Sequence, residues 1–555
     1  MQSCAVIGCG PAGMAASTAL RQSGLLVTCF ELAPAPGGIW ASNARDVVSS
    51  RGSVSPIYPS MRCVLPKELM SFSDIRFDSA IAQFPHHTAV QHYLNRYAAQ
   101  KGVRGLTRFN TKVESIRFDA ADRMWKLMSV NVVNGDVMEW CFDKVCVCTG
   151  QTQEVRLPAG LRERLAGYVR AGGELHHAAH VKDFRAFHKK RVVVVGDGVT
   201  AYDYCVELQR MGAEVHHSTT AAAPSSLAGR GPQQSLSASP WAQSPAARGR
   251  DRGAAVDVSD VRVAADAVTR LVSLAARMPW LRKDVHAASD VVRKWLRYRN
   301  ARLENIPTVG LPLDSEGRGL RFAADPTAHR STADVVAEAK ERAGGRGAPA
   351  DVFVDHIDAV VFATGYTRRY PFLHPDIRRV LEDDQPPLLL SPSPGSLPPP
   401  LPASGAPSAE HRRGLYLGTL WSAQPSLALV GHQREMLPPL LLFEAQARFI
   451  AYAFTQRISL PAGAAAMTAK EDALVHETPA LDELRSGDGL GLHSAAYFNV
   501  LQHELGVSSR DTYAAKVMQR QKWLLRSSIV RVYHKCRSMA PLKRKSQHLL
   551  FSNKI

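Results

Sequence analysis

Apolar and polar positions follow one another in a pattern that predicts the same strand–helix–strand unit twice. In each unit a short apolar run precedes a glycine-rich turn, an amphipathic helix and a second apolar run, which is typical of a parallel βαβ unit. The first unit comprises residues 3–7, 11–22 and 27–30, and the second comprises residues 191–195, 200–211 and 213–216. Two such units predict an α/β fold with two doubly wound domains.

Three stretches lie outside this pattern. Residues 219–256 are rich in Ala, Ser, Pro, Gly and Arg, and residues 385–413 contain a polyproline run. Neither has enough periodic apolar content to repay the entropy of ordering, so we interpret both as surface loops, with docking of a partner domain as the alternative for the second. Residues 516–555 form a basic tail whose amphipathic part indicates either a helix packed on the protein or contact with a membrane surface.

The composition limits the classes of protein to which the chain can belong. Its 555 residues are too many for one hydrophobic core, and 45% hydrophobic with 21% charged residues is typical of globular proteins. The longest apolar run, residues 437–454, contains Glu444 and Arg448 and falls short of the roughly 20 apolar residues that a membrane span needs. The net charge of +18 is spread along the chain, so we expect no nucleic-acid partner. The oligomeric state stays open.

The cysteines and the last residues bear on location. The nine cysteines include no CxxC pair, which favours a reducing compartment, and we expect no metal site. We therefore expect a cytoplasmic protein. The chain ends Asn553-Lys554-Ile555, which loosely resembles the SKL-type peroxisomal address and gives a second candidate location.

The first glycine-rich turn, Gly8-Cys9-Gly10-Pro11-Ala12-Gly13, has the spacing of a dinucleotide-binding site. Gly8 permits the tight turn, Gly10 lets the backbone approach a pyrophosphate, and Gly13 allows close packing of the helix. The N-terminus of that helix presents free N–H donors to the anion. Glu31 ends the second strand, where a carboxylate accepts hydrogen bonds from both adenosine ribose hydroxyls and would repel a 2′-phosphate. This turn therefore predicts FAD or NAD rather than NADP.

The second turn, Gly196-Asp197-Gly198-Val199-Thr200-Ala201, repeats the design with alanine at the third glycine position. The strand that follows ends in Ser218-Thr219-Thr220 without an acid, so hydroxyls face the place of a 2′-phosphate. Protonated rings of His216 and His217 could add to them. We expect a modest preference for NADPH over NADH, because hydroxyls bind phosphate less strongly than a bidentate arginine does.

Several further motifs resemble those of the flavin-containing monooxygenases. They are Phe30-Glu31, Gly37-Gly38-Ile39-Trp40, the segment Tyr58 to Phe72, Phe84-Pro85-His86-His87, Thr149-Gly150, the segment Asp358 to Tyr366 and Gly431-His432-Gln433. The resemblance covers about residues 3–220 and 352–462 and implies two Rossmann-like domains, with the NADPH domain inserted in a discontinuous FAD domain. The implied boundaries are 1–155 and 351–515 for the FAD domain, 156–350 for the NADPH domain and 516–555 for the tail.

The turns and the resemblance together give a set of expected cofactor-binding residues. They are Gly8, Gly10, Pro11, Ala12, Gly13, Glu31, Gly38, Ile39, Trp40, Gly196, Gly198, Thr200, Ala201, Ser218, Thr219, Thr220, Thr364, Gly365 and Gln433. The resemblance implies that NADPH reduces FAD, that the reduced flavin forms a C4a-hydroperoxide with O2, and that one oxygen passes to a soft nitrogen or sulfur nucleophile. N,N-dimethylaniline monooxygenase activity belongs to this class.

Two positions of expected catalytic importance depart from the family pattern. Cys63-Val64 stands where the family usually has Thr-Asn, and valine cannot make the hydrogen bond by which that asparagine helps to hold the oxygenated flavin. His177 is the histidine of the FxGxxxH signature, which here has Ala171 at its first aromatic position and Val181 at its closing one. A cofactor role and a packing role are both open for His177.

Two other functions remain open beside the monooxygenase. Val64 motivates the first, an NADPH oxidase or flavin reductase that releases hydrogen peroxide. The second is a catalytically lapsed nucleotide-binding protein that docks partners through its proline-rich segment and basic tail. The sequence does not indicate the small-molecule substrate.

Overall fold

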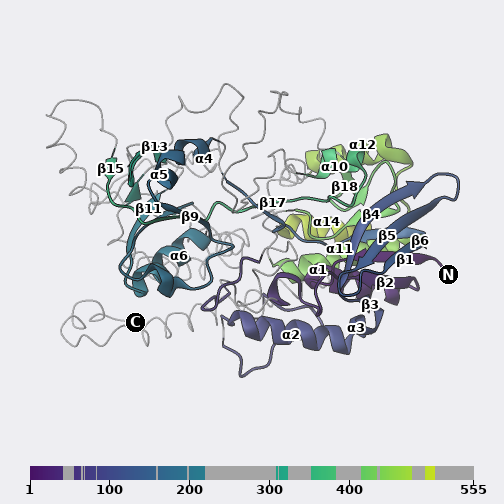
Figure 1. Cartoon of the computed structure of the whole chain (residues 1–555). Coiled ribbons are helices and arrows are strands. Elements are labelled where there is room, and N and C mark those ends of the chain that lie inside the picture. Colours follow the sequence, from purple (N-terminus) through teal and green to yellow (C-terminus); the bar gives the residue numbers. More distant parts are fainter. Residues whose placement is uncertain are drawn as a thin grey trace, which may run out of the picture.

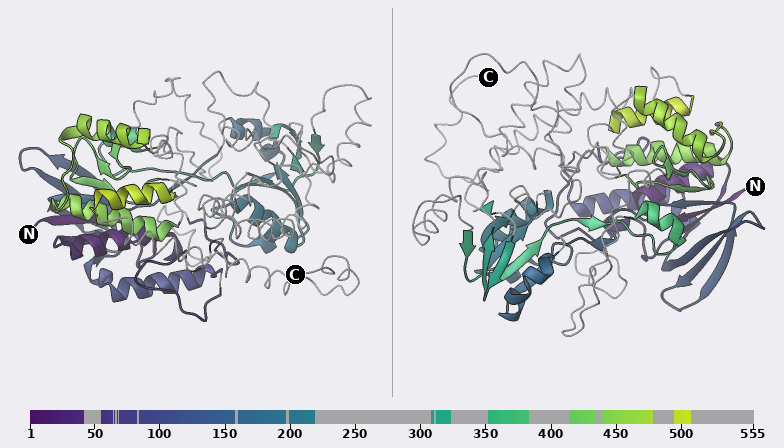
Figure 2. Two further views of the ribbon diagram at one scale, coloured as in Figure 1. Left: turned by 180° about the vertical axis from the view of Figure 1, so that it is seen from behind. Right: turned by 90° about the horizontal axis from the view of Figure 1, so that it is seen from above.

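The computed structural model describes residues 1–41, 55–63, 65, 67, 69–82, 84–157, 160–196, 199–218, 308–309, 312–322, 352–382, 414–433, 438–477 and 494–506. These residues form two α/β units, and Figure 1 shows a thin connection through β17 between them. The two views of Figure 2 show the units side by side, each with its own sheet. The predicted fold class, two Rossmann-like units, is confirmed.

The first unit is built on a seven-stranded sheet in the order β18-β19-β20-β7-β1-β2-β3. Its strands are β1 (Ser3–Ile7), β2 (Leu26–Phe30), β3 (Thr107–Arg108), β7 (Lys144–Val147), β18 (Leu415–Tyr416), β19 (Leu420–Trp421) and β20 (Leu427–Leu429). From β20 to β3 the strands are parallel. The sheet takes strands from both ends of the described chain, so the unit is discontinuous, as predicted.

Layers on both faces bury this sheet, which explains the continuous apolar runs of its strands. In β1, Cys4 and Val6 face a core shared with the helices, while Ala5 and Ile7 face a core shared with a second, antiparallel sheet. The helices are α1 (Pro11–Gln22), α2 (His87–Gln100), α3 (Val103–Leu106), α11 (Pro439–Phe454), α12 (Gly463–Glu477) and α14 (Ser494–Glu504). The antiparallel strands are β4 (Thr111–Asp119), β5 (Met124–Asn131) and β6 (Val137–Phe142). The short helix α10 (Pro375–Leu381) contributes Ile377 and Leu381 to the same core as that second sheet.

The second unit is built on a five-stranded parallel sheet in the order β12-β11-β10-β16-β9. These strands are β9 (Glu174–His177), β10 (Arg191–Val195), β11 (Glu214–Ser218), β12 (Thr308–Val309) and β16 (Ala359–Phe362). Helix α6 (Val199–Arg210) and the turn η2 (Phe184–Phe187) pack on one face. The other face carries α4 (Leu161–Arg164), α5 (Ala166–Arg170), β13 (Pro312–Glu316), β14 (Gly319–Phe322) and β15 (Val352–Val354).

The chain passes between the units along two paired strands. Strand β8 (Glu154–Val155) leads out of the first unit, and β17 (Tyr366–Thr367) pairs with it in antiparallel fashion on the way back. The return had been predicted at residue 351, but β15 and β16 still belong to the second unit. The apolar run of β16 is fully buried beside β10, so it cannot leave this sheet without exposing both core faces. The return therefore lies after residue 362.

Several sequence predictions concern residues outside the described ones. The segments 219–256 and 385–413 and the tail 516–555 all lie there, so their interpretation stays a prediction. Among the described helices, none combines the length and apolar character that a membrane crossing requires.

Candidate dinucleotide-binding sites

The first glycine-rich turn joins β1 to α1 with no space for side chains. Gly8 has a φ of +99°, and a β-carbon there would lie 2.7 Å from the carbonyl oxygen of Cys148 at the end of β7. A β-carbon on Gly13 would lie 1.8 Å from the carbonyl oxygen of Gly8. Both positions thus require glycine, as predicted from their spacing.

The N-terminus of α1 opens beside a second glycine turn. Gly10 is the N-cap of α1; no side chain caps the helix, and its first turn contains no acidic residue. Gly38 begins η1 (Gly38–Ala41), which contains Ile39 and Trp40, and a β-carbon on Gly38 would lie 3.0 Å from the α-carbon of Gly10. Two bare backbones therefore meet in front of an uncapped, 12-residue helix. Such an end attracts an anion, because free N–H groups and the helix dipole both favour negative charge.

Glu31 ties the end of β2 to this turn. Its Oε2 accepts the N–H of Cys9 at 2.6 Å, and its Oε1 accepts the N–H of Ala33 at 2.8 Å. Burial raises the pKa of the Glu31 carboxyl, and these backbone donors act in the opposite direction. Each carboxylate oxygen keeps a second lone pair for a ribose hydroxyl. Glu31 therefore has a structural role, which spacing alone did not indicate, in addition to its expected one.

The second turn repeats the backbone relationship of the first. Gly196 has a φ of +145°, and a β-carbon there would lie 2.5 Å from the carbonyl oxygen of Ala363, which directly follows β16. Ala201, at the third position, is fully buried in α6. Thr200 lies in the first turn of the same helix. Gly198 lies outside the described residues, so the second turn is characterised at its first and last positions.

The end of β11 lies against the second turn. The N–H of Gly196 donates to the carbonyl of Ser218 at 2.9 Å, and Nε2 of His217 donates to the carbonyl of Gly196 at 2.8 Å. His216 is also buried, and burial lowers the pKa of its ring, which disfavours the charged form that we considered for a phosphate contact. Ser218 itself is fully buried, and Thr219-Thr220 lie outside the described residues.

His177 ends β9, at the place where the chain returns to the first unit. It is 1% exposed, and burial lowers the pKa of its ring to about 3, so the ring is neutral near pH 7. Nδ1 accepts the N–H of Ala179 at 3.1 Å, which leaves the proton on Nε2. Nε2 is buried and has no hydrogen bond of normal geometry in the described part of the chain. The backbone of Gly365 also interacts with the ring and raises its pKa, against the larger effect of burial. His177 packs edge-on against Tyr366, at 5.4 Å between ring centroids.

Comparison with known proteins agrees with this geometry. Residues 1–227, which contain both turns, match the model of the flavin-binding monooxygenase-like family. Among the curated proteins that the chain resembles, flavin-containing monooxygenase 5 of Oryctolagus cuniculus is 26% identical over 382 residues, or 68% of the chain and 64% of that protein. Dimethylaniline monooxygenase [N-oxide-forming] 4 of Rattus norvegicus is 32% identical over 218 residues, or 39% of the chain and 37% of that protein.

The fold of the chain also resembles a solved structure. The S-allyl-L-cysteine S-oxygenase from Allium sativum aligns over 97% of the chain and 98% of its own, with a TM-score of 0.60 and 19% identity. This likeness shows a shared fold. The chain spans slightly less than two thirds of the length of the curated relatives that it matches over the longest ranges.

Thr364 and Gly365 lie in the connection between the two units. The hydroxyl of Thr364 donates to the carbonyl of Arg156, and the N–H of Arg156 donates to the carbonyl of Gly365 at 3.0 Å. Gly365 has a φ of +85°, with open space where a β-carbon would point. The two residues therefore fix the paired strands β8 and β17 to each other.

Gln433 lies in the first unit, in the turn after β20, and its side chain faces the interior of that unit. Its Nε2 donates to the carbonyl of Gly418, and its Oε1 accepts Nε2 of Gln446 at 2.7 Å. Gln446 also accepts the N–H of Gly431 at 2.9 Å and donates to the hydroxyl of Tyr497 at 2.9 Å. The side chain of Gln433 thus supports the turn 431–433, and its backbone carbonyl accepts Nε2 of Gln151.

Sequence reasoning missed the residues that hold segment 55–63 on the second unit. The hydroxyl of Tyr58 donates to Asp203 in α6 at 2.8 Å, and that of Ser60 donates to Glu207 at 3.0 Å. Nζ of Lys182 donates to the carbonyls of Ser55 at 2.7 Å and of residue 57 at 2.6 Å. Burial lowers the pKa of Lys182 to about 8. In the sequence, the lysine five residues after His177 was the one available signal. Val64, just beyond this segment, lies outside the described residues.

Proposed function

We propose that the chain is an FAD-dependent, NADPH-driven monooxygenase. In this proposal it transfers one oxygen of O2 to a soft nitrogen or sulfur nucleophile through a flavin C4a-hydroperoxide. The observation that carries the proposal is the repeated turn geometry, in which Gly8 lies against Cys148 and Gly196 lies against Ala363 on two linked sheets. Two dinucleotide sites in one chain favour an enzyme that moves a hydride from one cofactor to the other.

The first unit fits FAD. The uncapped N-terminus of α1 would hold the pyrophosphate, and Gly10 and Gly38 leave it room for close approach. Glu31 would accept the ribose hydroxyls, and Trp40 in η1 would border the flavin, as the resemblance implies. The turn 431–433 would offer the backbone N–H groups of His432 and Gln433 rather than the Gln433 side chain, because that side chain is bound inward and the carbonyls of the turn accept hydrogen bonds from Gln151 and Arg368.

The second unit fits NADPH. The turn that starts at Gly196 would hold its pyrophosphate, and the strand end at 218–220 lacks an acid that would repel a 2′-phosphate. His177 is the buried, neutral ring next to the return at Gly365, and its Nε2–H is a donor available to a bound cofactor. We assign it as a cofactor-positioning residue rather than an acid or base, because a pKa of about 3 keeps it neutral.

FAD supplies the redox chemistry when bound, and the protein supplies position and an environment that excludes water. In this proposal Lys182, Tyr58 and Asp203 fix segment 55–63 against the second unit. The hydrogen bonds of Thr364 and Gly365 keep the two connecting strands together.

The nitrogen or sulfur class of nucleophile draws support from the names of the relatives. One is an N-oxide-forming dimethylaniline monooxygenase and another is an S-oxygenase. The test is incubation of the purified protein with NADPH, O2 and N,N-dimethylaniline or a thioether. We expect an N-oxide or sulfoxide in an amount that depends on both NADPH and O2. Absence of both products while NADPH is consumed would contradict the monooxygenase proposal.

A second candidate function is an NADPH oxidase that releases hydrogen peroxide, and Val64 is the observation that favours it. The same incubation separates the two, because an oxidase converts nearly all NADPH into peroxide whether a nucleophile is present or not.

A further inference from the structure

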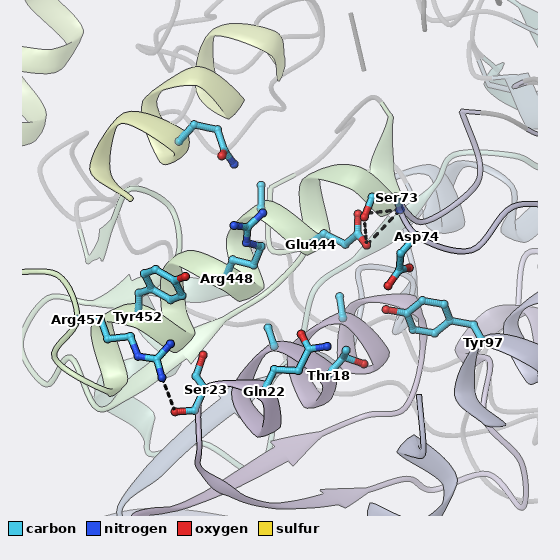
Figure 3. A pocket seen from close by; sticks show the side chains of 14 residues that line it. Thr18, Gln22, Ser23, Ser73, Asp74, Tyr97, Glu444, Arg448, Tyr452 and Arg457 are labelled. Carbon is cyan, nitrogen blue, oxygen red and sulfur yellow. Dashed lines mark hydrogen bonds between the residues drawn. The ribbon is translucent and has the colours of Figure 1, made fainter. Parts of the chain in front are cut away.

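A polar cavity of about 340 Å³ lies beside the C-terminal half of α1, away from both glycine-rich turns. Its walls come from α1, α11 and α14 and from residues 73–74, and Figure 3 shows Arg448 and Tyr452 of α11 facing Thr18 and Gln22 of α1. None of its lining residues belongs to segments 8–13 or 31–40. The volume is at the lower end of the range for small-molecule sites.

The acidic groups of this cavity already have partners. Both carboxylate oxygens of Glu444 accept the N–H of Ser73, and Oε1 also accepts its hydroxyl at 3.0 Å. Asp74 forms an ion pair with Lys101. These carboxylates therefore have little remaining capacity to attract a cation.

The basic groups of the cavity have fewer hydrogen-bond and ion-pair partners among the described residues. Within the described ranges the side chain of Arg457 donates to one acceptor, the carbonyl of Ser23, at 3.4 Å, and its guanidinium lies 5.5 Å from the ring centre of Tyr452. Arg448 makes no hydrogen bond or ion pair within the part of the chain that the structure describes. The two acidic and two basic residues that line the cavity balance in number, but the acidic pair is the one with close polar partners. The guanidinium groups are therefore the charged groups open to a ligand, and a guanidinium binds carboxylate and phosphate oxygens through two parallel hydrogen bonds.

Gln502 of α14 is the second, independent indication of a ligand. It lines the cavity and is 3% exposed, yet among the residues that the structure describes neither its Nε2 nor its Oε1 has a hydrogen-bond partner. A buried amide without partners is costly, and unsatisfied groups of this kind are rare in native proteins. A ligand with an oxygen acceptor and a hydroxyl or amine donor would satisfy both atoms.

We propose that this cavity binds a small molecule with an oxyanionic group, either a carboxylate or a phosphate. Arg448 and Arg457 bind the anionic group, and the amide of Gln502 forms hydrogen bonds with the ligand. The site is separate from the two dinucleotide sites, because it lies along the flank of α1 rather than at its N-terminus. It does not depend on the proposed monooxygenase activity.

The test is isothermal titration of the full chain with citrate and, separately, with inorganic phosphate. Saturating FAD and NADP+ are present so that oxyanion sites at the glycine-rich turns are filled. We expect one anion to bind at one site per chain, and which of the two binds more tightly identifies the class. Arg448→Gln should weaken that binding roughly tenfold to a hundredfold, because it removes charge-assisted hydrogen bonds.

Two further variants make the test specific. Gln502→Leu removes the buried amide while leaving all charges, and it should also weaken binding roughly tenfold or more. Arg117→Gln makes the same charge change on β4, at an exposed site away from the cavity, and should leave the affinity unchanged. Absence of binding by either anion at millimolar concentration, or equal affinity in all four proteins, would overturn the proposal.

Discussion

The carbonyl oxygen of Gly8 occupies the place that a side chain at position 13 would need, since a β-carbon on Gly13 would lie 1.8 Å from it. No β-carbon tolerates such a distance, so Gly13→Ala must push α1 away from β1. We expect the free energy of unfolding to fall by about 1–3 kcal/mol, the usual cost of overpacking, and FAD binding to be lost as well. Urea unfolding followed by circular dichroism measures the first effect. Equal stability of the variant and the parent protein would contradict the packing described for this turn.

Gly10 differs from Gly13, because its substitution tests cofactor binding without disturbing the fold. A β-carbon on Gly10 would lie 3.5 Å from the α-carbon of Gly38, an ordinary contact, and its φ of −74° suits any residue. We expect Gly10→Val to fold normally and to lack FAD, because the extra methyl groups fill the approach to the helix N-terminus. Gly105→Val is the matched control, since the space around that position is open. The measurement is the flavin released per chain on denaturation.

Coenzyme preference should depend on Thr219 and Thr220 rather than on Ser218. Ser218 is fully buried and its carbonyl holds Gly196, so its replacement would disturb the strand end. We expect kcat/KM to be roughly tenfold higher for NADPH than for NADH, which corresponds to about 1–2 kcal/mol from hydroxyl contacts to a phosphate. The double variant Thr219→Ala, Thr220→Ala should bring the two values close together. If the ratio of kcat/KM for NADPH to that for NADH is unchanged in this variant, these two hydroxyls do not determine the coenzyme preference.

Lys182 should give the stability of the protein a distinctive pH dependence. Burial lowers its folded-state pKa to about 8, whereas an unfolded lysine titrates near 10.5. Between these two values the unfolded chain holds a proton that the folded chain has lost, so the contribution of Lys182 to the free energy of unfolding rises with pH. Below about pH 8 the full cost of burying the charge is present.

The measurement is urea unfolding between pH 7.5 and 10 on the wild type and on Lys182→Met. We expect the free energy of unfolding to rise more steeply with pH in the wild type, because both proteins share all other titrating groups. Lys112→Met changes an exposed lysine and should keep the wild-type slope. Parallel curves for the wild type and Lys182→Met would mean that this amine is not buried as described.

Val64→Asn should improve the coupling of NADPH use to oxygenation, a prediction that rests on the family resemblance because Val64 lies outside the described residues. One missing buried hydrogen bond costs about 1–3 kcal/mol, which would shorten the life of an oxygenated flavin roughly tenfold to a hundredfold. We expect a large fraction of the NADPH consumed by the wild type without substrate to appear as peroxide. The asparagine variant should lower that fraction and leave the rate of flavin reduction nearly unchanged. If the wild type releases almost no peroxide, another residue performs this role.

The glycine-rich turns could be predicted from sequence because their requirement is local. Gly8, Gly13 and Gly196 each need a backbone without a side chain, and the spacing within one strand–helix junction shows this directly. The boundary at residue 351 was wrong for the opposite reason. Whether the apolar run 359–362 belongs to one sheet or the other depends on its pairing with β10, which lies far away in the sequence.

Sequence patterns also could not predict which side chains form hydrogen bonds with distant parts of the chain. The bonds from Lys182 to the carbonyls of segment 55–63 join positions with no shared periodicity. The inward network of Gln433 depends on Gln446 and Tyr497, which lie on two later helices. In both cases the residue type was visible, but its contacts are set by the packing of distant elements.

An absorbance spectrum of the purified protein tests the central claim most directly. It is recorded before NADPH is added, after anaerobic addition of NADPH, and again after oxygen is readmitted. The account predicts a yellow protein with one FAD per chain, bleaching by NADPH, and return of the oxidised spectrum with oxygen, while Gly10→Val is colourless. A colourless wild-type protein, a bound flavin that NADPH does not bleach, or a Gly10→Val protein with a full complement of FAD would contradict it.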